Sequence, residues 1–542
     1  MTYCELETLI RRHMEAYPVP GISVAVTDGR ETLWEGHYGL SDRESGCPVW
    51  SGTRFQQGSI TKVLTALALM QLRDRGEFDP HRPVREHLSW LEFPRGGEGI
   101  TGHHLLTHTS GLPLVRDDVP SSPFMAYLAR ECTLVDTPGV SYHQSEIGFQ
   151  VLWCLLEKLA GKPYHRLIAD EILRPLGMND SEARIVPDSS GNLATGYQYL
   201  YDDRPNHSSY PLARAPRFEY LAGDGCLVST ASDMAILMRT LLNRGVSSSG
   251  HRLISEESYE LMTRPLAKRW EGSFYGYGLY VRYVDGHKII GHGGDMPGFQ
   301  SMMLGDLDLG VGVVVCINGP GSPLFPFYCA MYALALLRAQ KEGLPAPEEA
   351  PLPERVRVAN AGEYAGEYRG TERVIRVSED DDGCLSLHWG VDAGSLESLG
   401  GDVMVCCHPT FSLYALRFVR DSTGRVVEIE HGEDVYRVPN HPGQPEHRFP
   451  SEWRSFVGHY RMYSPWAPAN FRVVLRRGRL ILITPGTMSY GGSEDQLFPA
   501  ESGVFLVGAN DSPDRVEFTD IVDGRALRAR LCGSWHYRVS MA

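Results

Sequence analysis

Long apolar runs are missing from the sequence. The longest ones, residues 63–72 and 327–337, fall short of the roughly 18 residues that span a bilayer. The N-terminal segment, residues 1–21, is amphipathic and contains acidic side chains, unlike the apolar region of a signal peptide. We therefore expect a soluble, cytoplasmic protein with no membrane partner.

Positive charge is also in short supply. The chain has 52 lysine and arginine residues against 67 acidic ones, which gives a net charge of -15. Phosphate backbones and anionic lipids would on average be repelled by such a chain. Nucleic acid is therefore not an expected partner.

The cysteines lack the spacing of a disulfide framework or a zinc ribbon. There are 11 of them, an odd number, spread from Cys4 to Cys532 without a C-x-x-C pair. Only Cys406 and Cys407 are adjacent. This pattern favours a reducing compartment.

Several catalytic signatures are absent as well. The sequence has no G-x-S-x-G elbow, H-E-x-x-H pair, P-loop or G-x-G-x-x-G loop. His103, His104 and His108 resemble a metal cluster, but their neighbours are apolar and no carboxylate stands at the usual ligand offsets. We interpret them as structural, so the sequence calls for no metal and no cofactor.

The composition is that of a globular protein, with 42% hydrophobic and 22% charged residues over a length of 542. Up to about residue 345, strand patterns alternate with helix-length apolar stretches, such as those within residues 61–76, 149–161, 231–245 and 325–340. A proline-rich, acidic stretch at 341–356 is typical of a linker. We predict a catalytic domain over residues 1–345.

The remaining sequence changes to short alternating strands separated by glycine-rich turns. It also repeats: AGEYRG at 365–370 returns as VGHYRM at 457–462, and VYRV at 435–438 returns as HYRV at 536–539. The repeat length is about 90 to 100 residues. We predict two tandem antiparallel β-barrels, over residues 357–440 and 450–542.

A serine and a lysine could form a reactive pair. Ser59 and Lys62 are three residues apart at the start of a predicted helix, so they share one helix face. The helix N-terminus stabilises negative charge on the serine oxygen, and burial of the lysine favours its free amine. The pair is a candidate activated nucleophile, although S-x-x-K alone is a weak pattern.

Five collinear segments give this pair a context. They are residues 18–29, 54–62, 103–113, 223–234 and 291–299. In this order and spacing they resemble the serine β-lactamase-like hydrolases: class C β-lactamases, penicillin-binding proteins, esterases and D-aminopeptidases. The resemblance covers roughly residues 1–340. It implies an α+β fold, a β-lactamase/transpeptidase-like sandwich of an antiparallel sheet and helices with a helical subdomain, and an active site between them.

The resemblance also implies roles for individual residues. Ser59 would attack an acyl carbonyl and form an acyl-enzyme, with Lys62 as its general base. The backbone N–H groups of Ser59 and Asp295 would form the oxyanion hole. His292 and Gly294 match the H-x-G motif of the family, so His292 would contact a substrate carboxylate or assist proton transfer.

One family motif is altered. The family usually carries Y-x-N where residues 138–149 read PGVSYHQSEIGF, which places Gln144 at the tyrosine position and Glu146 at the asparagine position. A glutamine amide cannot ionise, so proton transfer to the leaving group needs another carrier. Tyr142 could reach in through a register change, although it more closely matches a packing aromatic. Glu146 could supply a carboxylate, or Lys62 and His292 could share the work; we favour this last arrangement.

The two barrels resemble the lipocalin-like C-terminal domains of D-aminopeptidases. In those enzymes a loop of the last barrel reaches the active site and restricts it to short substrates with a free amine. Residues 484–496 are the matching loop here. Its Glu494 and Asp495 could bind a substrate ammonium, but a solvated acidic turn is the preferred interpretation.

Three functions are compatible with these observations. The leading one is a serine hydrolase that cleaves small amides, esters or short peptides, including those of D-amino acids. The second is an acyltransferase or peptide cyclase of a biosynthetic pathway, because the same acyl-enzyme can pass to an amine when water is excluded. The third is a catalytically weak ligand-binding protein. A small molecule or short peptide is the expected partner, and a homo-oligomer is compatible with the sequence.

Overall fold

The computed structural model describes residues 2–114, 122–186, 192–217, 219–322, 324–348, 356–358, 360–463, 469–486, 491–510, 512 and 514–541. Its α-helices are α1 (Thr2–Ala16), α2 (Thr61–Asp74), α3 (Gly102–Leu106), α4 (Ser122–Tyr127), α5 (Glu146–Ala160), α6 (Tyr164–Ile168), α7 (Arg174–Leu176), α8 (Ala231–Leu242), α9 (Glu256–Thr263) and α10 (Phe325–Glu342). Shorter helical turns are η1 (Gly58–Ile60), η2 (Val84–Glu86), η3 (Leu128–Glu131), η4 (Ala169–Leu173), η5 (Ala361–Glu363) and η6 (Ser451–Ser455).

The strands before the barrels are β1 (Gly21–Asp28), β2 (Thr32–Asp42), β3 (Cys47–Pro48), β4 (Phe55–Gln56), β5 (Tyr197–Tyr199), β6 (Leu212–Arg214), β7 (Val228–Ser229), β8 (Ala267–Trp270), β9 (Ser273–Tyr275), β10 (Tyr280–Val284), β11 (His287–Met296), β12 (Phe299–Asp306) and β13 (Val311–Ile317). Nine of them form one antiparallel sheet in the order β3-β2-β1-β13-β12-β11-β10-β9-β8.

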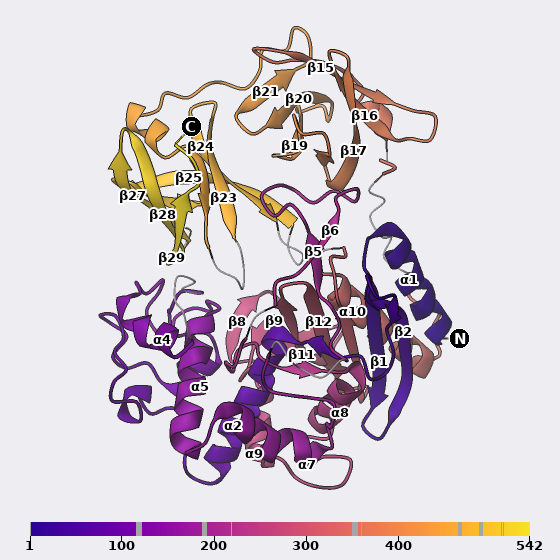
Figure 1. Ribbon diagram of the computed structural model, residues 1–542, viewed down its shortest axis with the longest axis vertical. Helices are drawn as coiled ribbons and strands as arrows, with labels where there is room; N and C mark the ends of the chain where they lie inside the picture. The colour runs from indigo at the N-terminus through magenta and orange to yellow at the C-terminus, as the bar shows by residue number, and fades with distance from the viewer. Residues whose placement is uncertain are drawn as a thin grey trace.

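Helices cover both faces of this sheet, as Figure 1 shows. α1 and α10 pack on one face through a core that includes Ile22, Val24 and Val26 of β1. α8 packs on the other face, in a core that also holds α2, α5 and Ala25. Alternate residues of β1 therefore enter different cores, which explains why the strand is an almost unbroken apolar run. The predicted α+β sandwich with a helical subdomain is confirmed.

Two closed eight-stranded barrels follow. The first contains β14 (Gly366–Arg369), β15 (Val374–Glu379), β16 (Leu385–Trp389), β17 (Asp392–Gly400), β18 (Val403–Cys406), β19 (Leu416–Arg420), β20 (Val426–His431) and β21 (Asp434–Arg437). The second contains β22 (Gly458–Arg461), β23 (Asn470–Arg476), β24 (Arg479–Gly486), β25 (Gly491–Glu501), β26 (Val504–Val507), β27 (Arg515–Val522), β28 (Arg525–Leu531) and β29 (Ser534–Arg538).

The sequence repeat has a structural counterpart in these barrels. Tyr368 donates a hydrogen bond to the backbone oxygen of Tyr364 at 2.8 Å, and Tyr460 donates one to Phe456 at 2.9 Å, in both cases four residues earlier. Each tyrosine is buried and fixes the start of its barrel to the preceding turn. The prediction of two tandem antiparallel barrels is confirmed.

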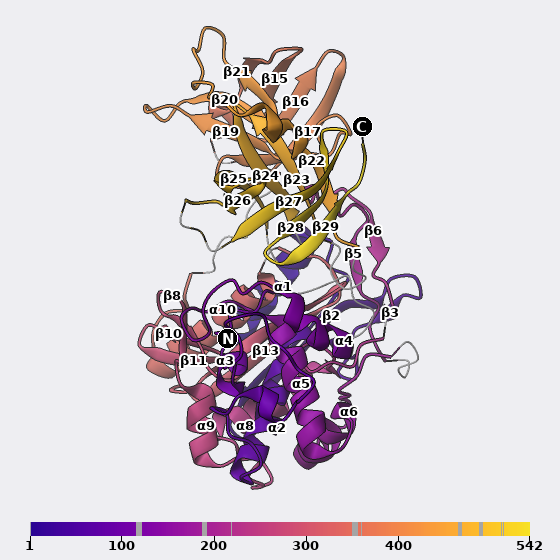
Figure 2. The ribbon, with the colours of Figure 1, turned by 90° about the vertical axis from the view of Figure 1, so that its left-hand side faces the viewer.

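The connection between β5 and β6 ties both barrels to the catalytic part. Asp202 forms an ion pair with Arg461 of the second barrel, and the Ser208 N–H donates to Glu397 of the first barrel at 3.1 Å. Figures 1 and 2 show the β5–β6 hairpin rising toward the barrels, which lie above the sheet. One loop of the catalytic part therefore positions both C-terminal barrels.

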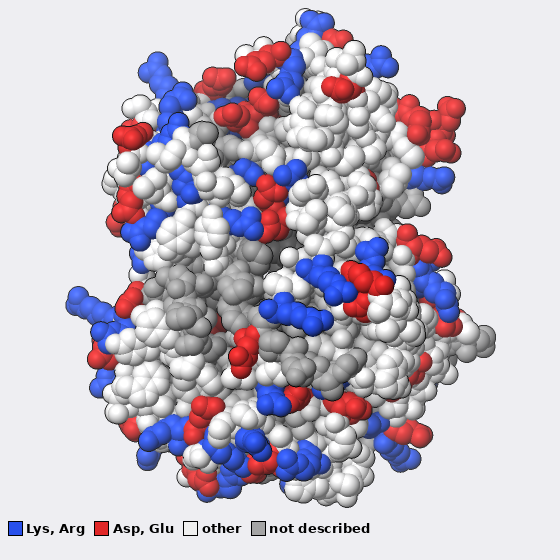
Figure 3. All heavy atoms as spheres, in the orientation of Figure 1, with Lys and Arg blue, Asp and Glu red and all other residues white. Residues whose placement is uncertain are grey.

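The distribution of charge on the surface and the apolar content of the helices agree with the charge and hydropathy of the sequence. Blue and red side chains are interspersed over the face drawn in Figure 3, without a broad basic area. Among the described helices, none combines the length and the apolar character that a bilayer crossing demands.

Candidate active site

Ser59 lies in a tight turn that leads into α2. Gly58 has a φ of +51°, a conformation that residues with a Cβ rarely adopt. A Cβ at Gly58 would also lie 2.6 Å from the backbone oxygen of Asp295 in β11. The turn therefore needs glycine at this position, and it leaves Ser59 partly exposed while Lys62, one turn later, is buried.

Lys62 connects three parts of the site. Its Nζ donates to Ser59 Oγ at 2.7 Å and to the backbone oxygen of Asp224 at 3.3 Å. The same Nζ lies 2.6 Å from Glu146 Oε2, and the lysine side chain has no exposed surface. The structure thus brings Ser59 and Lys62 together and adds a carboxylate on the other side of the amine.

The start of α5 positions this carboxylate. Ser145 is the N-cap, and its side chain accepts the Gly148 N–H at 3.1 Å. The Ser145 N–H in turn donates to His108 Nδ1 at 3.1 Å. Glu146 follows as the first helical residue, and its side chain extends to Lys62.

Gln144 and Tyr142 form a second layer behind the ion pair. Gln144 Nε2 donates to Glu146 Oε1 at 3.1 Å, and the Tyr142 hydroxyl donates to Gln144 Oε1 at 3.4 Å. The phenol therefore connects to Lys62 through two intervening side chains. Gln144 orients the carboxylate, and Glu146 is the ionisable group that contacts the lysine.

His292 lies on β11, and both of its ring nitrogens are in hydrogen-bond contact with the protein. Its Nδ1 lies 2.5 Å from the Gly293 backbone oxygen, which can only accept, so Nε2 accepts the Tyr275 hydroxyl at 2.8 Å. Burial lowers the pKa of His292 well below its usual value, and the charge of Lys62 lowers it further. His292 is therefore a neutral imidazole whose two nitrogens are both engaged within the sheet.

The glycines of β11 allow this strand to lie against the Ser59 turn. A Cβ at Gly294 would be 1.8 Å from the Gln57 backbone oxygen and 3.0 Å from the Ser59 backbone nitrogen. The next residue is Asp295, whose backbone nitrogen would lie 2.7 Å from a Cβ at Gly58. The backbone nitrogens of Ser59 and Asp295 thus belong to two segments in close contact, as an oxyanion hole requires.

Gly294→Ala is expected to lower the rate of Ser59 acylation about 10- to 100-fold, because the methyl group would push β11 away from the turn. Gly293→Ala is the matched control, since the close contact of a Cβ there is with the flexible end of Met302, at 2.8 Å, and the nearest backbone atom, the Ser301 oxygen, is 3.6 Å away. Acylation rates of the two variants with one activated ester give the comparison. Equal rates would show that the close approach of β11 is unimportant for the reaction.

Sequence reasoning missed a buried carboxyl behind Lys62. Asp224 accepts hydrogen bonds from Tyr220 at 2.7 and 2.8 Å and from Gln150 Nε2 at 2.7 Å. Burial raises the pKa of Asp224 to about 7, with Glu146 adding to the rise and Lys62 opposing it. Asp224 lies in a family segment and Tyr220 is only four residues before it, but Gln150 comes from α5, so no local pattern signals the whole network.

Glu494, in the acidic loop of the second barrel, is already paired and is not available to bind a substrate ammonium. That carboxylate pairs with Arg476 at 2.7 Å and lies 3.6 Å from Arg417 of the first barrel. Asp495 accepts the Ser493 hydroxyl at 2.7 Å. Residues 487–490 of the predicted loop lie outside the described residues. Glu494 serves contacts between and within the barrels rather than remaining a solvated turn.

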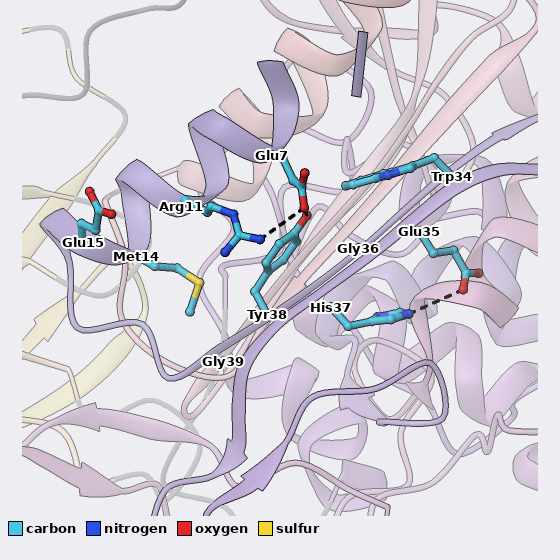
Figure 4. Close-up of a pocket in the computed structure, with 10 residues that line it drawn as sticks. All are labelled: Glu7, Arg11, Met14, Glu15, Trp34, Glu35, Gly36, His37, Tyr38 and Gly39. Atoms are coloured by element: carbon cyan, nitrogen blue, oxygen red, sulfur yellow. Dashed lines mark hydrogen bonds and ion pairs between the residues drawn. The ribbon is translucent and has the colours of Figure 1, made fainter. Parts of the chain in front are cut away.

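A separate cavity of about 610 Å³ is lined by residues of α1 and β2 (Figure 4). Four of its charged or titratable side chains pair with one another: Arg11 with Glu7 at 3.4 Å and His37 with Glu35 at 3.6 Å. The cavity holds none of the predicted site residues.

Known proteins share this fold and sequence pattern. Penicillin-binding protein 4* of Bacillus subtilis is 25% identical over 56% of this chain and 69% of its own length. An unguisins hydrolase of Aspergillus campestris is 27% identical over 57% of this chain and 60% of its own length. The chain thus matches about 60 to 70% of the length of these relatives.

Solved structures agree on the architecture. The octameric penicillin-binding protein homologue from Pyrococcus abyssi has a TM-score of 0.59, is 27% identical, and covers 80% of this chain and 100% of its own. A D-amino acid amidase from Ochrobactrum anthropi shares the fold with a TM-score of 0.53, 20% identity, and coverage of 63% and 99%. A family model described as Beta-lactamase matches residues 6–338. The chain belongs to the β-lactamase family of serine hydrolases.

Proposed function

We propose that the protein hydrolyses small amides, esters or short peptides, D-amino-acid derivatives among them, through an acyl-enzyme on Ser59. The observation that carries this proposal is the 2.7 Å contact between Lys62 Nζ and Ser59 Oγ, in a site where Glu146 lies 2.6 Å from the same nitrogen. A partly exposed hydroxyl next to a buried amine is the arrangement that activates a serine.

The acylation step uses the ion pair as a proton relay. As Ser59 Oγ bonds to the substrate carbonyl carbon, its proton passes to Lys62 Nζ and a lysine proton passes to Glu146. The carbonyl oxygen becomes negative and is held by the N–H groups of Ser59 and Asp295. When the tetrahedral intermediate collapses, the bond to the leaving group breaks and the relay returns one proton to it. Water then attacks the acyl-enzyme by the same steps, which releases the acid and restores Ser59.

Glu146 takes the place of the missing family tyrosine in this scheme. Gln144 cannot ionise, and it contributes by orienting Glu146 with its amide. Tyr142 supports Gln144, and His292 fixes β11 as a neutral hydrogen-bonded side chain. Of the three carriers that the sequence left open, the contacts therefore favour Glu146 over the pairing of Lys62 with His292.

The cellular compartment, the oligomeric state and the domain limits are part of the same proposal. All eleven cysteines are free, which supports a reducing compartment such as the cytoplasm. The octameric homologue from Pyrococcus abyssi supports a test for self-association. We keep the domain limits 1–345, 357–440 and 450–542 as proposals; α10 ends at Glu342 and β14 begins at Gly366.

A fluorophosphonate probe tests the proposal. We expect one covalent adduct at neutral pH, located by peptide mass spectrometry on Ser59 and absent from Ser59→Ala. An acyl ester substrate, with and without an added amine, then separates hydrolysis from acyl transfer, since transfer gives product only with the acceptor. If the native protein stays unlabelled, the third of the functions considered, a ligand-binding protein, is favoured instead.

A further inference from the structure

A tight turn of the second barrel, between β28 and β29, lies next to the catalytic part. Leu531 pairs with Ser534, so the turn consists of Cys532 and Gly533. Their φ angles are +47° and +91°, and a two-residue hairpin turn of type I′ requires positive φ at both positions. The Cys532 N–H donates to the backbone oxygen of Arg515 at 2.9 Å, which fixes the turn to β27. Figures 1 and 2 show β28 and β29 on the side of the barrel that lies toward α4 and α5.

Gly533 packs directly against Pro113, in the loop that follows α3. A Cβ at Gly533 would lie 2.6 Å from Pro113 Cβ and 3.0 Å from Pro113 Cγ. Pro113 is buried, and its ring is too rigid to move aside as a long side chain would. The contact therefore requires a glycine in the turn, because an added methyl group would displace the turn, the loop or both.

An electrostatic interaction joins the same two parts. Burial lowers the pKa of His143, and the negative charge of Asp514 opposes this effect, followed by that of Asp136. Asp514 belongs to the second barrel and accepts a hydrogen bond from Cys532 Sγ at 3.4 Å. His143 lies two residues before Ser145, the N-cap of α5. The barrel thus faces both the Pro113 loop and the chain that enters α5.

The Pro113 loop holds the start of α5 through two successive backbone oxygens. The Ser145 hydroxyl donates to the Pro113 oxygen at 2.8 Å, and the Glu146 N–H donates to the Leu114 oxygen at 2.7 Å. Glu146 Oε2 lies 2.6 Å from Lys62 Nζ. A continuous series of contacts therefore runs from the barrel turn to the catalytic ion pair. A shift of about 1 Å in such a series can lower a rate by up to about 100-fold.

We propose that Gly533 is a positioning residue for Glu146: the β28–β29 turn packs against Pro113 and fixes the start of α5, which keeps the carboxylate next to Lys62. This proposal rests on the proposed acyl-enzyme function and on the relay through Glu146. It gives the second barrel a part in the acylation rate that is exerted through the loop before α5, since Gly533 itself contacts Pro113 and not the reacting groups.

Gly533→Ala tests the proposal. We expect it to lower the rate of Ser59 acylation by about 5- to 30-fold, because the methyl group displaces the Pro113 loop and the start of α5. Gly524→Ala is the matched control. Gly524 has a φ of +71° in the two-residue turn between β27 and β28, and among the described residues a Cβ there would meet nothing within 4 Å. Both variants strain a turn of the same barrel, but only Gly533→Ala meets Pro113. Equal labelling rates with a fluorophosphonate would overturn the proposal.

A double-mutant cycle with Glu146→Gln shows whether Gly533 acts through Glu146. Once the relay is lost, adding Gly533→Ala should change the acylation rate by less than about twofold. A further loss as large as that in the native chain would show that the turn acts elsewhere, and it would remove the positioning role alone. Glu146→Gln labelled at the native rate would instead remove the catalytic role of Glu146, and this proposal with it. The two failures are therefore distinguishable.

Pro113→Ala provides the same test from the catalytic side if Gly533→Ala does not fold, as judged by its melting temperature. It removes the ring that Gly533 contacts and keeps the backbone oxygen that Ser145 uses. It should slow acylation in the native chain and leave the rate of Glu146→Gln unchanged. A native rate in Pro113→Ala, or an equal loss in both backgrounds, would overturn the proposal.

Discussion

Lys62→Met is expected to slow acylation of Ser59 by about three to four orders of magnitude. Methionine approximates the length of the lysine side chain but can neither accept the serine proton nor pair with Glu146. The change also leaves a largely buried carboxylate without its counter-ion, which should lower the free energy of unfolding by about 3 kcal/mol. Single-turnover labelling and denaturant unfolding measure the two effects separately.

The double variant Lys62→Met, Glu146→Gln distinguishes these effects. Neutralising Glu146 removes the unpaired charge, so stability should recover while acylation stays slow. Recovery of both properties would mean that Lys62 acts on Ser59 only through the stability of the fold. A single variant that is labelled at the native rate would remove Lys62 from the mechanism.

The fold could be predicted because its patterns are local. Helix-length apolar stretches predict α2 and α5, both helices are buried along most of their length, and both form where the sequence indicates them. The barrels repeat one tyrosine contact, seen at Tyr368 and Tyr460. The contact of Ser59 with Lys62 is equally local, since it depends on i, i+3 spacing at one helix start.

The rest of the site depends on how distant elements dock, and no short pattern encodes that. Glu146 reaches Lys62 because the N-terminus of α5 packs beside α2. The hydrogen bond between His292 Nε2 and Tyr275 joins β11 to β9, which no motif around His292 indicates. Periodicity indicates which residues form α5 or β8, but it does not fix which side chains meet across elements.

Glu146→Gln tests the relay most directly. We expect it to lower the acylation rate by about two to three orders of magnitude, because glutamine keeps the shape of the side chain but cannot take a proton from Lys62. Tyr142→Phe is the control, since the hydroxyl that it removes donates to Gln144 in the second layer at 3.4 Å, and it should change the rate by less than about threefold. Single-turnover labelling with the same probe gives both values.

The pH profile of this variant provides an independent measurement. The negative charge of Glu146 helps to raise the pKa of Asp224 to about 7, so Asp224 is protonated below that pH and ionises above it. Without the charge of Glu146, ionisation of Asp224 costs less, and its pKa falls. An inflection of the acylation rate near pH 7 should therefore move to lower pH in Glu146→Gln and stay in place in Tyr142→Phe. If Tyr142→Phe instead caused the larger loss of rate, the phenol would be the proton carrier, and Glu146 would act only as the counter-ion that holds Lys62 against Ser59.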